Sequence, residues 1–243
     1  MRSHYFIIEP SAFAGDGSVS IVGQDARHIS KVLRLRAGDR ITVSDGVGQS
    51  YQVELGAVGD KQVSGRVLNS SPFVIPRHGL TVFQGLPKGR KMDLIVEKLT
   101  EIGVARIAPV AFTRSVPEYG ADREAKRLER WKAIGYEACK QSRRPWLPDI
   151  SEVLLWDEAL EELNVFEEVL VPYEEFRGLK LDDVFEALGN TAVFVGPEGG
   201  FEESEIADLD KRGAKLFSLG SNILRTETAA IVSATLVLDR MNS

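Results

Sequence analysis

Two glycine-bearing stretches near the C-terminus constrain the fold of this chain more than any other feature. Residues 193–201 are VFVGPEGGF, and residues 219–229 are LGSNILRTETA. In each, an apolar run of the kind found in interior parallel strands passes through a loop into a segment with helical spacing. The glycines permit close backbone approach, and Pro197 restricts the turn. Two such loops at one edge of a parallel sheet predict an α/β fold with a ligand site.

The residues that follow each loop predict a helix. Ser204 and its acidic neighbours open one helix, in which Ile206, Leu209 and Ala207 form the inner stripe. Thr226 is predicted to be the N-cap of a last helix that runs to about residue 240. The alternative is that both loops are merely tight turns. Arg225 favours a site, because a turn needs no arginine between an apolar run and a capping threonine.

Composition excludes several classes of protein. The 243 residues are 43% hydrophobic and 27% charged, which is typical of a globular chain. No run approaches the roughly 18 apolar residues of a membrane span, and residues 1–5 lack the apolar core of a signal peptide. We therefore expect a cytoplasmic protein with no membrane partner. Cys139 is the only cysteine, and with three scattered histidines it predicts neither a disulfide nor a metal site.

The net charge of −6 hides a strong asymmetry along the chain. Residues 1–150 carry 23 Lys and Arg against 16 Asp and Glu, a net of +7, whereas residues 151–243 carry 7 against 20, a net of −13. Such asymmetry indicates that the first part meets a polyanion.

Residues 1–71 form a predicted small β-barrel domain. Strands are expected at 4–8, 18–22, 40–44, 51–55 and 62–68, separated by glycine-containing turns. A short helix is expected over 25–35, with Ile29, Val32 and Leu33 facing inward. Its basic face suits RNA docking, although a solvated face explains it equally well. The candidate RNA-binding residues here are Arg27, Lys31, Arg34 and Arg36.

A turn-rich linker over 72–79 leads to the second predicted domain, 80–243. A strand over 80–84, a helix that ends at Gly103 and a strand over 105–110 form a βαβ unit. The intervening loop, 85–91, lacks the spacing and the Ser or Thr of a phosphate-binding loop. Either it touches RNA through Lys88, Arg90 and Lys91, or it is simply solvated.

Residues 122–142 are predicted to form the most distinct helix. Leu128, Trp131, Ile134 and Ala138 recur at helical spacing, which places Trp131 in the core. The opposite face is rich in basic residues and is expected either to contact RNA phosphates or to be solvated. The candidates on it and just after it are Arg123, Lys126, Arg127, Arg130, Arg143 and Arg144.

The remaining segments complete the sheet and its cover. A strand is expected over 168–171 and a helix over 181–188, and Val171, Pro172 and Tyr173 form a third candidate ligand loop. The last helix is apolar on more than one side, so it must be covered on both faces. A second subunit would supply that cover.

Several segments, in order along the chain, resemble the RsmE family of the SPOUT methyltransferase superfamily. They are GPEGGF over 196–201, LGxxILRTETA over 219–229, VLR over 32–34, EKLTEIGV over 97–104, ERW over 129–131 and QSRR over 141–144. Members of this family methylate N3 of a uridine in 16S ribosomal RNA. The resemblance implies a PUA-like N-terminal domain, a C-terminal SPOUT domain with a deep trefoil knot, and a homodimer formed through that domain.

The resemblance also implies S-adenosylmethionine as the cofactor and the small ribosomal subunit as the partner. The implied cofactor-binding residues are Val171, Pro172, Tyr173, Gly196, Pro197, Glu198, Gly199, Gly200, Leu219, Gly220, Ile223, Leu224, Arg225 and Thr226. Arg225 is expected to stabilise charge on the uracil carbonyls, or to form a salt bridge with Glu227 or Glu198 instead. Glu198 is a second catalytic candidate, or an acceptor that orders the loop. The alternatives are a noncatalytic RNA-binding assembly protein and a SPOUT methyltransferase acting on another RNA.

Overall fold

The computed structural model of the chain describes residues 4–73, 79–112, 121–176, 178–186 and 189–242. These residues divide into two compact units. The first contains the described residues up to Phe73 together with Cys139–Leu147, and the second contains the rest. The sequence did not indicate that 139–147 would join the first unit. They do so by hydrogen bonds, because the Ser44 hydroxyl and the Gly48 N–H both donate to the Pro145 carbonyl at 2.8 and 3.1 Å.

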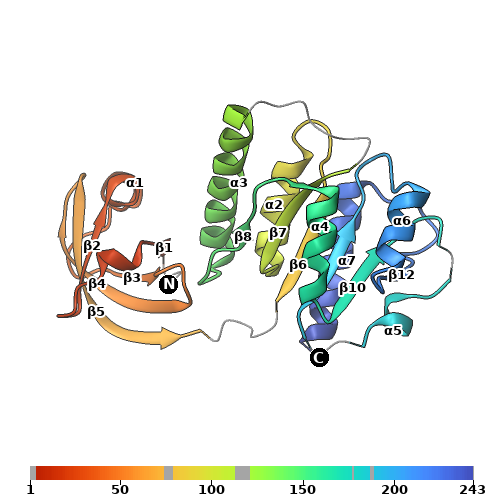
Figure 1. Cartoon of the computed structure of the whole chain (residues 1–243). Coiled ribbons are helices and arrows are strands. Elements are labelled where there is room, and N and C mark those ends of the chain that lie inside the picture. The colour runs from red at the N-terminus through yellow and green to blue at the C-terminus, as the bar shows by residue number, and fades with distance from the viewer. Residues whose placement is uncertain (1–3, 74–78, 113–120, 177, 187–188, 243) are drawn as a thin grey trace. The chain divides into compact units, whose positions relative to one another are not determined.

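A five-stranded sheet with the order β1-β3-β4-β5-β2 forms the described part of the first unit. The sheet curls around one apolar core to which every strand contributes (Figure 1). Its edge strands, β1 and β2, are not paired with each other within the described residues, so the predicted barrel is a curled open sheet. The strands are β1 (Tyr5–Ile7), β2 (Ser18–Val22), β3 (Arg40–Ser44), β4 (Gln49–Val58) and β5 (Gln62–Pro72), with a 3₁₀ turn, η1, at Pro10–Ala12.

The basic helix of this unit differs from the prediction. It consists of α1 (Gly23–Arg27) followed by η2 (His28–Val32), a π-helical turn in which the Leu33 N–H donates to the His28 carbonyl at 2.9 Å. A π turn adds one residue per turn and so rotates the residues that follow it. Ile29 is buried as predicted, but Val32 is 69% exposed and its predicted inward position is wrong.

The second unit contains a sheet in which all described strand pairs are parallel. The strand order is β12-β10-β11-β6-β7-β8, and β9 also pairs with β7. The strands expected over 80–84, 105–110 and 168–171 are confirmed, as is the buried strand before the first glycine loop. The strand before the second loop, β12, lies at the edge of the sheet and is only partly buried, so its predicted interior position is wrong. The strands are β6 (Leu80–Gly85), β7 (Arg106–Ala111), β8 (Asp149–Ile150), β9 (Leu154–Leu155), β10 (Glu168–Pro172), β11 (Thr191–Val195) and β12 (Lys215–Phe217).

Helices cover both faces of this sheet. One core lies under α2 (Lys91–Ile102), α3 (Ala121–Ser142), α5 (Leu181–Val184) and α7 (Thr226–Met241). The other lies under α4 (Trp156–Glu162), the 3₁₀ turn η3 (Leu163–Val165) and α6 (Glu203–Asp210). In Figure 1, α4 lies in front of the sheet and α7 behind it. This two-sided cover explains why the central strands are apolar on both faces.

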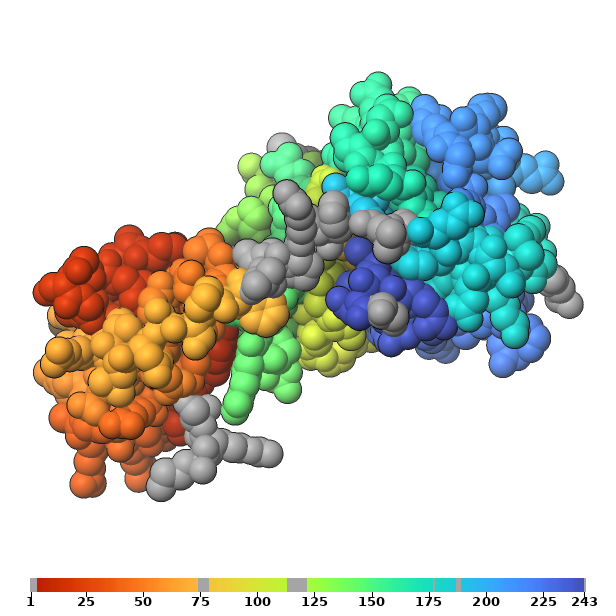
Figure 2. Space-filling model, turned by 90° about the horizontal axis from the view of Figure 1, so that it is seen from below, coloured from red at the N-terminus to blue at the C-terminus, as the bar shows by residue number. Residues whose placement is uncertain are grey.

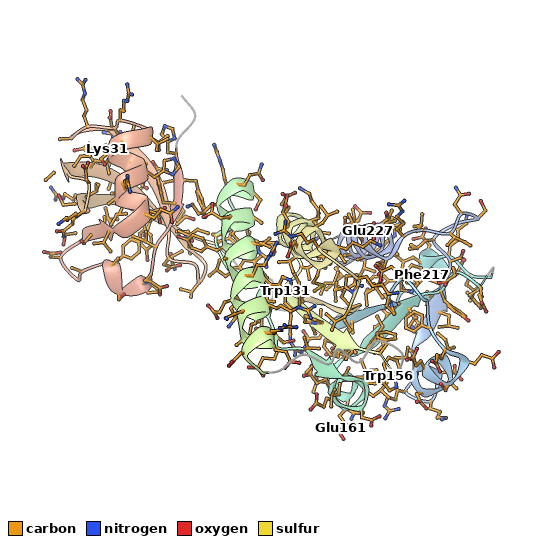
Figure 3. All side chains as sticks on the ribbon, turned by 90° about the horizontal axis from the view of Figure 1, so that it is seen from above. Lys31, Trp131, Trp156, Glu161, Phe217 and Glu227 are labelled. Carbon is orange, nitrogen blue, oxygen red and sulfur yellow. The ribbon has the colours of Figure 1, made fainter. Side chains whose placement is uncertain are left out.

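Several predicted helical details are confirmed and others are wrong. Gly103 ends α2 in the left-handed conformation with φ 104°, and Trp131 on α3 is 3% exposed (Figure 3). The helix expected over 181–188 stops at Val184, because Phe185 is extended; residues 187 and 188 lie outside the described residues. In α6, Glu202 rather than Ser204 is the N-cap, and Ala207 faces solvent.

A surface ion pair joins two helices, α7 and α5, in the acidic C-terminal part of the chain. Arg240 near the end of α7 lies 2.7 Å from Asp182 of α5. Figure 2 shows the dark-blue end of α7 beside the cyan segment that contains α5. No helix among the described residues is long and apolar enough to cross a membrane.

Candidate functional site

The strand order creates a crevice at the carboxyl ends of β6 and β11. The chain leaves β6 towards α2 on one face of the sheet and leaves β11 towards α6 on the other. These two strands are neighbours, so the loops that follow them diverge. Such a switch point is where open parallel sheets bind ligands. The glycine loop after β11 and the loop before α7 meet here, as predicted.

A buried hydrogen-bond chain holds these loops together. The Gln84 side chain at the end of β6 donates to the Thr226 hydroxyl at 2.9 Å and to the Gly85 carbonyl at 2.8 Å. The Thr226 hydroxyl donates in turn to the Gly196 carbonyl at 2.6 Å. Gln84 is fully buried and Thr226 is 5% exposed. One hydroxyl therefore connects β6, the GPEGGF loop and the start of α7.

The predicted capping role of Thr226 is wrong. Arg225 occupies the N-cap position, and its side chain makes no capping hydrogen bond; Thr226 is the first helical residue. The backbone of Arg225 is extended, with φ −67° and ψ 151°, so the helix starts one residue earlier than its capping pattern predicted. The threonine side chain is recruited by the tertiary hydrogen bond to Gly196 instead of by the helix end.

Replacing Thr226 with valine should remove this connection without changing the side-chain volume. The Gly196 carbonyl would lose its donor and the Gln84 amide one acceptor, which is expected to lower the free energy of unfolding by about 1–3 kcal/mol. Chemical denaturation measures this. Thr228→Val on the exposed face of the same helix is the control. Equal stability of the two variants would show that this chain of hydrogen bonds contributes nothing to the free energy of unfolding.

A cavity of about 270 Å³ opens at this crevice. Its wall combines backbone of the two loops with apolar side chains and four charged ones. The lining residues are Lys91, Pro172, Glu174, Val195, Gly196, Pro197, Glu198, Gly200, Phe201, Ile223, Leu224, Arg225, Thr226 and Ala229. The volume is close to the lower end of the range of about 300–1,000 Å³ for small-molecule pockets.

Most predicted cofactor-binding residues line this cavity. Val171, Tyr173, Gly199, Leu219 and Gly220 belong to the same loops but are not part of its wall. The residues that sequence reasoning did not place in a pocket are Lys91, Glu174, Val195, Phe201 and Ala229. Each lies next to a predicted loop or at the start of the following helix. Val195, Glu174 and Phe201 end or follow a predicted strand, and Lys91 and Ala229 lie in the first turn of the next helix; that placement is the signal from which they could have been found.

Glu198 is held by the segment that follows β6. Its two carboxylate oxygens accept hydrogen bonds from the Lys88 N–H at 3.0 and 3.1 Å, and its Oε1 lies 2.9 Å from Lys91 Nζ. Burial alone would raise the pKa of Glu198, but the bonds from Lys91 and the Lys88 backbone outweigh it and lower that pKa. A carboxylate with a lowered pKa is a weak base, so this geometry suits a loop-ordering acceptor.

The ion pair between Lys91 and Glu198 makes stability depend on pH. Because the folded-state pKa of Glu198 is lowered from 4.5, its contribution is present above about pH 4.5 and is lost as the pH falls through the folded-state value. Lys91→Met should raise the pKa of Glu198 and flatten stability across this acidic range. Carboxyl NMR titration and denaturation at several pH values measure both effects. Lys132→Met, whose Glu129 partner is 3.9 Å away and exposed, is the control.

Arg225 lies at the wall of the cavity and is exposed. Within the described residues, its guanidinium has no ion pair; Glu198 and Glu227 instead lie 2.9 and 3.6 Å from Lys91. Figure 3 shows Glu227 at the beginning of α7. Arg225 therefore forms no salt bridge with Glu198 or Glu227 in this structure. The guanidinium remains available to a ligand.

The predicted RNA-binding residues fall into two groups. The larger group is exposed: Arg27, Lys31, Arg34, Arg36, Lys88, Arg90, Arg123, Lys126, Arg130 and Arg143. Of these, Lys31 pairs with Asp60 and Arg130 with Asp93.

The second group is not on an open face. Lys91 faces the pocket carboxylates, and Arg127 stacks on Trp131 with its guanidinium 4.9 Å from the ring centroid. Arg144 is 6% exposed and stacks on Trp146, and burial lowers its pKa to about 10. A buried side chain does not suit a phosphate contact, so Arg144 is structural in this geometry. The described residues contain no group of three or more side chains suited to a metal ion.

The chain is similar to known proteins over most of its length. A family model described as an RNA methyltransferase domain matches residues 76–238, and one described as an RNA methyltransferase PUA domain matches residues 21–68. The sequence is 34% identical over 222 residues to ribosomal RNA small subunit methyltransferase E of Mycobacterium bovis, covering 89% of this chain and 85% of that protein. It is 32% identical over 227 residues to the Bacillus subtilis protein of the same name, covering 90% and 88%.

A solved structure is similar over nearly the whole chain. It is a ribosomal RNA small subunit methyltransferase E from Neisseria gonorrhoeae bound to S-adenosyl methionine. The TM-score is 0.84 at 28% sequence identity, and the match covers 98% of both chains. Both units, and the site between the glycine loops of the second, fall within the matched length.

Proposed function

Because this chain belongs to the ribosomal RNA small subunit methyltransferase E family of RNA methyltransferases, we propose that it methylates N3 of a uridine in 16S ribosomal RNA, using S-adenosylmethionine. One observation carries the proposal: the glycine loop after β11 and the loop that ends in Arg225 together line a cavity at the switch point of the parallel sheet.

The cavity fits this cofactor by its wall chemistry. Val195, Phe201 and Leu224 supply apolar surface for a purine ring, and the glycines bring bare backbone beside it. A Cβ on Gly196 would lie 3.1 Å from the Phe201 ring, so a larger residue there would require this cavity-lining ring to shift by a few tenths of an ångström. A Cβ on Gly199 would have no described atom within 4 Å apart from its chain neighbours, so that side of the loop is open. When bound, the sulfonium of the cofactor supplies an activated methyl group.

Within this proposal, Arg225 acts on the uracil. Methylation of N3 requires loss of its proton, which leaves negative charge shared with the neighbouring carbonyl oxygens. A guanidinium at the cavity wall, unpaired with any carboxylate of the described residues, stabilises that charge and orients the base. Glu198 orders the loop through Lys88 and Lys91. Since N3 is hidden in a base pair, the target nucleotide must be unpaired or flipped out.

The basic surface of the first unit is proposed to dock the RNA. Arg34 and Arg143 are the non-glycine residues with positive φ in the described parts of the chain, at 53° and 59°. That conformation closes the last turn of the helix before each arginine, since the Leu35 N–H donates to the Ile29 carbonyl at 3.1 Å and the Arg144 N–H to the Cys139 carbonyl at 3.0 Å. What supports docking is that both arginine side chains are exposed. Arg36, two residues after Arg34, is also exposed.

Replacing Arg34 and Arg36 should weaken RNA binding and make the RNA affinity less dependent on salt concentration. Each phosphate that the protein no longer neutralises lowers the slope of log affinity against log salt by about 0.7–0.9. Arg34→Gly also suits the left-handed backbone, so the Arg34→Gly/Arg36→Gln protein should remain folded. Filter binding to a ribosomal RNA fragment at several salt concentrations measures the slope. Lys211→Gln, an exposed residue just after α6, is the control, and an unchanged slope in the double variant would refute docking here.

Three further features are proposed from family membership: the trefoil knot in the second unit, a homodimer and a cytoplasmic location. For the dimer, α7 supports the proposal because Ile231 and Val232 are half-buried and Leu236 is 39% exposed, so part of its apolar surface lacks cover within the described chain. Light scattering at micromolar concentration tests the dimer.

The function is tested with labelled S-adenosylmethionine and small ribosomal subunits that lack native methylation. Incorporation of label into the RNA supports the proposal. Cofactor binding without incorporation would favour another RNA substrate. Neither binding nor incorporation would favour a noncatalytic RNA-binding assembly protein.

A further inference from the structure

The cavity contains a second carboxylate that the mechanism above leaves unused. Glu174 follows β10 by two residues and lines the cavity. One of its carboxylate oxygens lies directly over Gly200, since a Cβ built on that glycine would be 2.8 Å from Glu174 Oε1. Gly200, with φ 71°, therefore leaves the space in which this carboxylate sits. The next residue, Phe201, forms part of the same wall.

Neighbouring carboxylates are already engaged, whereas Glu174 is exposed and unpaired among the residues that the structure describes. Glu198 accepts from the Lys88 N–H and pairs with Lys91. Glu175 accepts a hydrogen bond from the Tyr173 hydroxyl at 2.9 Å, and burial followed by this bond raises the pKa of Tyr173 to about 12. Within the part of the chain that the structure describes, Glu174 has no hydrogen-bond or ion-pair partner. Its oxygens are free to accept hydrogen bonds from a bound molecule.

The surroundings of Glu174 indicate which part of a nucleoside it would meet. Phe201 lines the cavity and makes an edge contact with Tyr173, with ring centroids 6.2 Å apart. Such an apolar wall suits the purine, and the ribose is the group attached directly to the purine. β10 is also the hydrogen-bonded neighbour of β11, which carries the glycine loop. In dinucleotide-binding folds, an acidic side chain associated with a glycine loop binds ribose hydroxyls.

We infer that Glu174 recognises the ribose of the cofactor, its carboxylate accepting hydrogen bonds from the vicinal 2′- and 3′-hydroxyls. The inference rests on the proposed function and adds a specificity determinant to that site. A carboxylate with two free oxygens matches two adjacent O–H donors. The contact selects a ribonucleoside over a deoxyribonucleoside and leaves Arg225 free to act on the RNA base.

Calorimetry with product analogues tests the inference without requiring turnover. The probes are S-adenosylhomocysteine, its 2′-deoxy and 3′-deoxy forms, and 5′-methylthioadenosine, which lacks the amino-acid group. Glu174→Gln should weaken binding of S-adenosylhomocysteine and of 5′-methylthioadenosine by a similar factor, about ten- to a hundredfold for charge-assisted hydrogen bonds. The deoxy forms should bind wild type more weakly and lose little more in the variant.

Glu175→Gln is the matched control, because its carboxylate belongs to the same loop but not to the cavity wall. It should leave all four affinities unchanged. Weaker binding of S-adenosylhomocysteine with unchanged binding of 5′-methylthioadenosine would overturn the inference, because the carboxylate would then meet the ammonium group. Unchanged affinity for every probe in Glu174→Gln would also overturn it. Failure of the wild type to bind S-adenosylhomocysteine would overturn the proposed function itself, and the inference with it.

Discussion

Replacing Arg225 with alanine is expected to reduce methyl transfer by about 10²–10³-fold while leaving cofactor affinity unchanged. Loss of one preorganised donor aimed at developing negative charge typically has an effect of this size. The side chain makes no capping hydrogen bond, and Glu198 and Glu227 are paired with Lys91. Removing the guanidinium should therefore leave the loop and the start of α7 in place.

Single-turnover methyl transfer and calorimetry with S-adenosylhomocysteine separate the two effects. Arg225→Lys should recover part of the rate, since it keeps the charge but not the planar two-donor geometry of the guanidinium. Arg212→Ala is the control; its side chain bonds to the Asp208 carbonyl on α6, outside the cavity. Full turnover in Arg225→Ala would remove this residue from the mechanism. Loss of cofactor binding in that variant would instead assign Arg225 to the cofactor.

Replacing Gly85 with alanine is expected to damage both stability and cofactor binding. A Cβ on Gly85 would lie 2.5 Å from the Pro197 nitrogen and 2.9 Å from the Phe112 ring. The first of these contacts is with backbone, which cannot move aside as a flexible side chain can. Overpacking of this kind lowers the free energy of unfolding by about 1–3 kcal/mol. It also displaces Pro197, which lines the cavity, so affinity for S-adenosylhomocysteine should fall.

Gly199→Ala is the matched control for the stability effect. Gly199 is in the same loop as Pro197, but a Cβ there would have no described atom within 4 Å apart from its chain neighbours. Chemical denaturation should therefore find Gly199→Ala close to wild type and Gly85→Ala less stable. If Gly85→Ala proved as stable as wild type and bound the cofactor with full affinity, the close contact between the end of β6 and the GPEGGF loop would contribute to neither stability nor cofactor binding.

The predictions that held depend on local pattern. Apolar runs located the interior strands, helical spacing placed Trp131 in the core, and Gly103 marked the end of α2. Glycine and proline also located the loops that line the cavity. These signals are local because the period of a strand or helix and the conformational freedom of glycine are properties of short segments.

The predictions that failed depend on tertiary contacts. Thr226 has the residue type of an N-cap, but a long-range hydrogen bond to Gly196 engages its hydroxyl. Val32 has the spacing of a buried residue, but the π turn at 28–32 rotates it outward. Arg144 belongs to a basic run, yet it is buried against Trp146. No pattern in a single sequence specifies which distant residue will meet a given side chain.

The pocket residues also divide into those set by local pattern and those set by tertiary structure. The loops were predictable from the sequence. Lys91 was assigned to RNA and Glu174 to no role, because their positions in the pocket follow from the order of the strands in the sheet. That β10 and β6 flank β11 is a consequence of topology. Only this order brings both charged side chains to the wall of one cavity.

The most direct test of the central claim is to locate the transferred methyl group. Small ribosomal subunits without native methylation are incubated with the protein and S-adenosylmethionine, and the 16S RNA is digested and analysed by mass spectrometry with synthetic methyluridine standards. The account predicts 3-methyluridine at a single position, absent when Arg225→Ala replaces the wild type. A methyl group on another atom or another nucleotide, or none despite measurable cofactor binding, would contradict it.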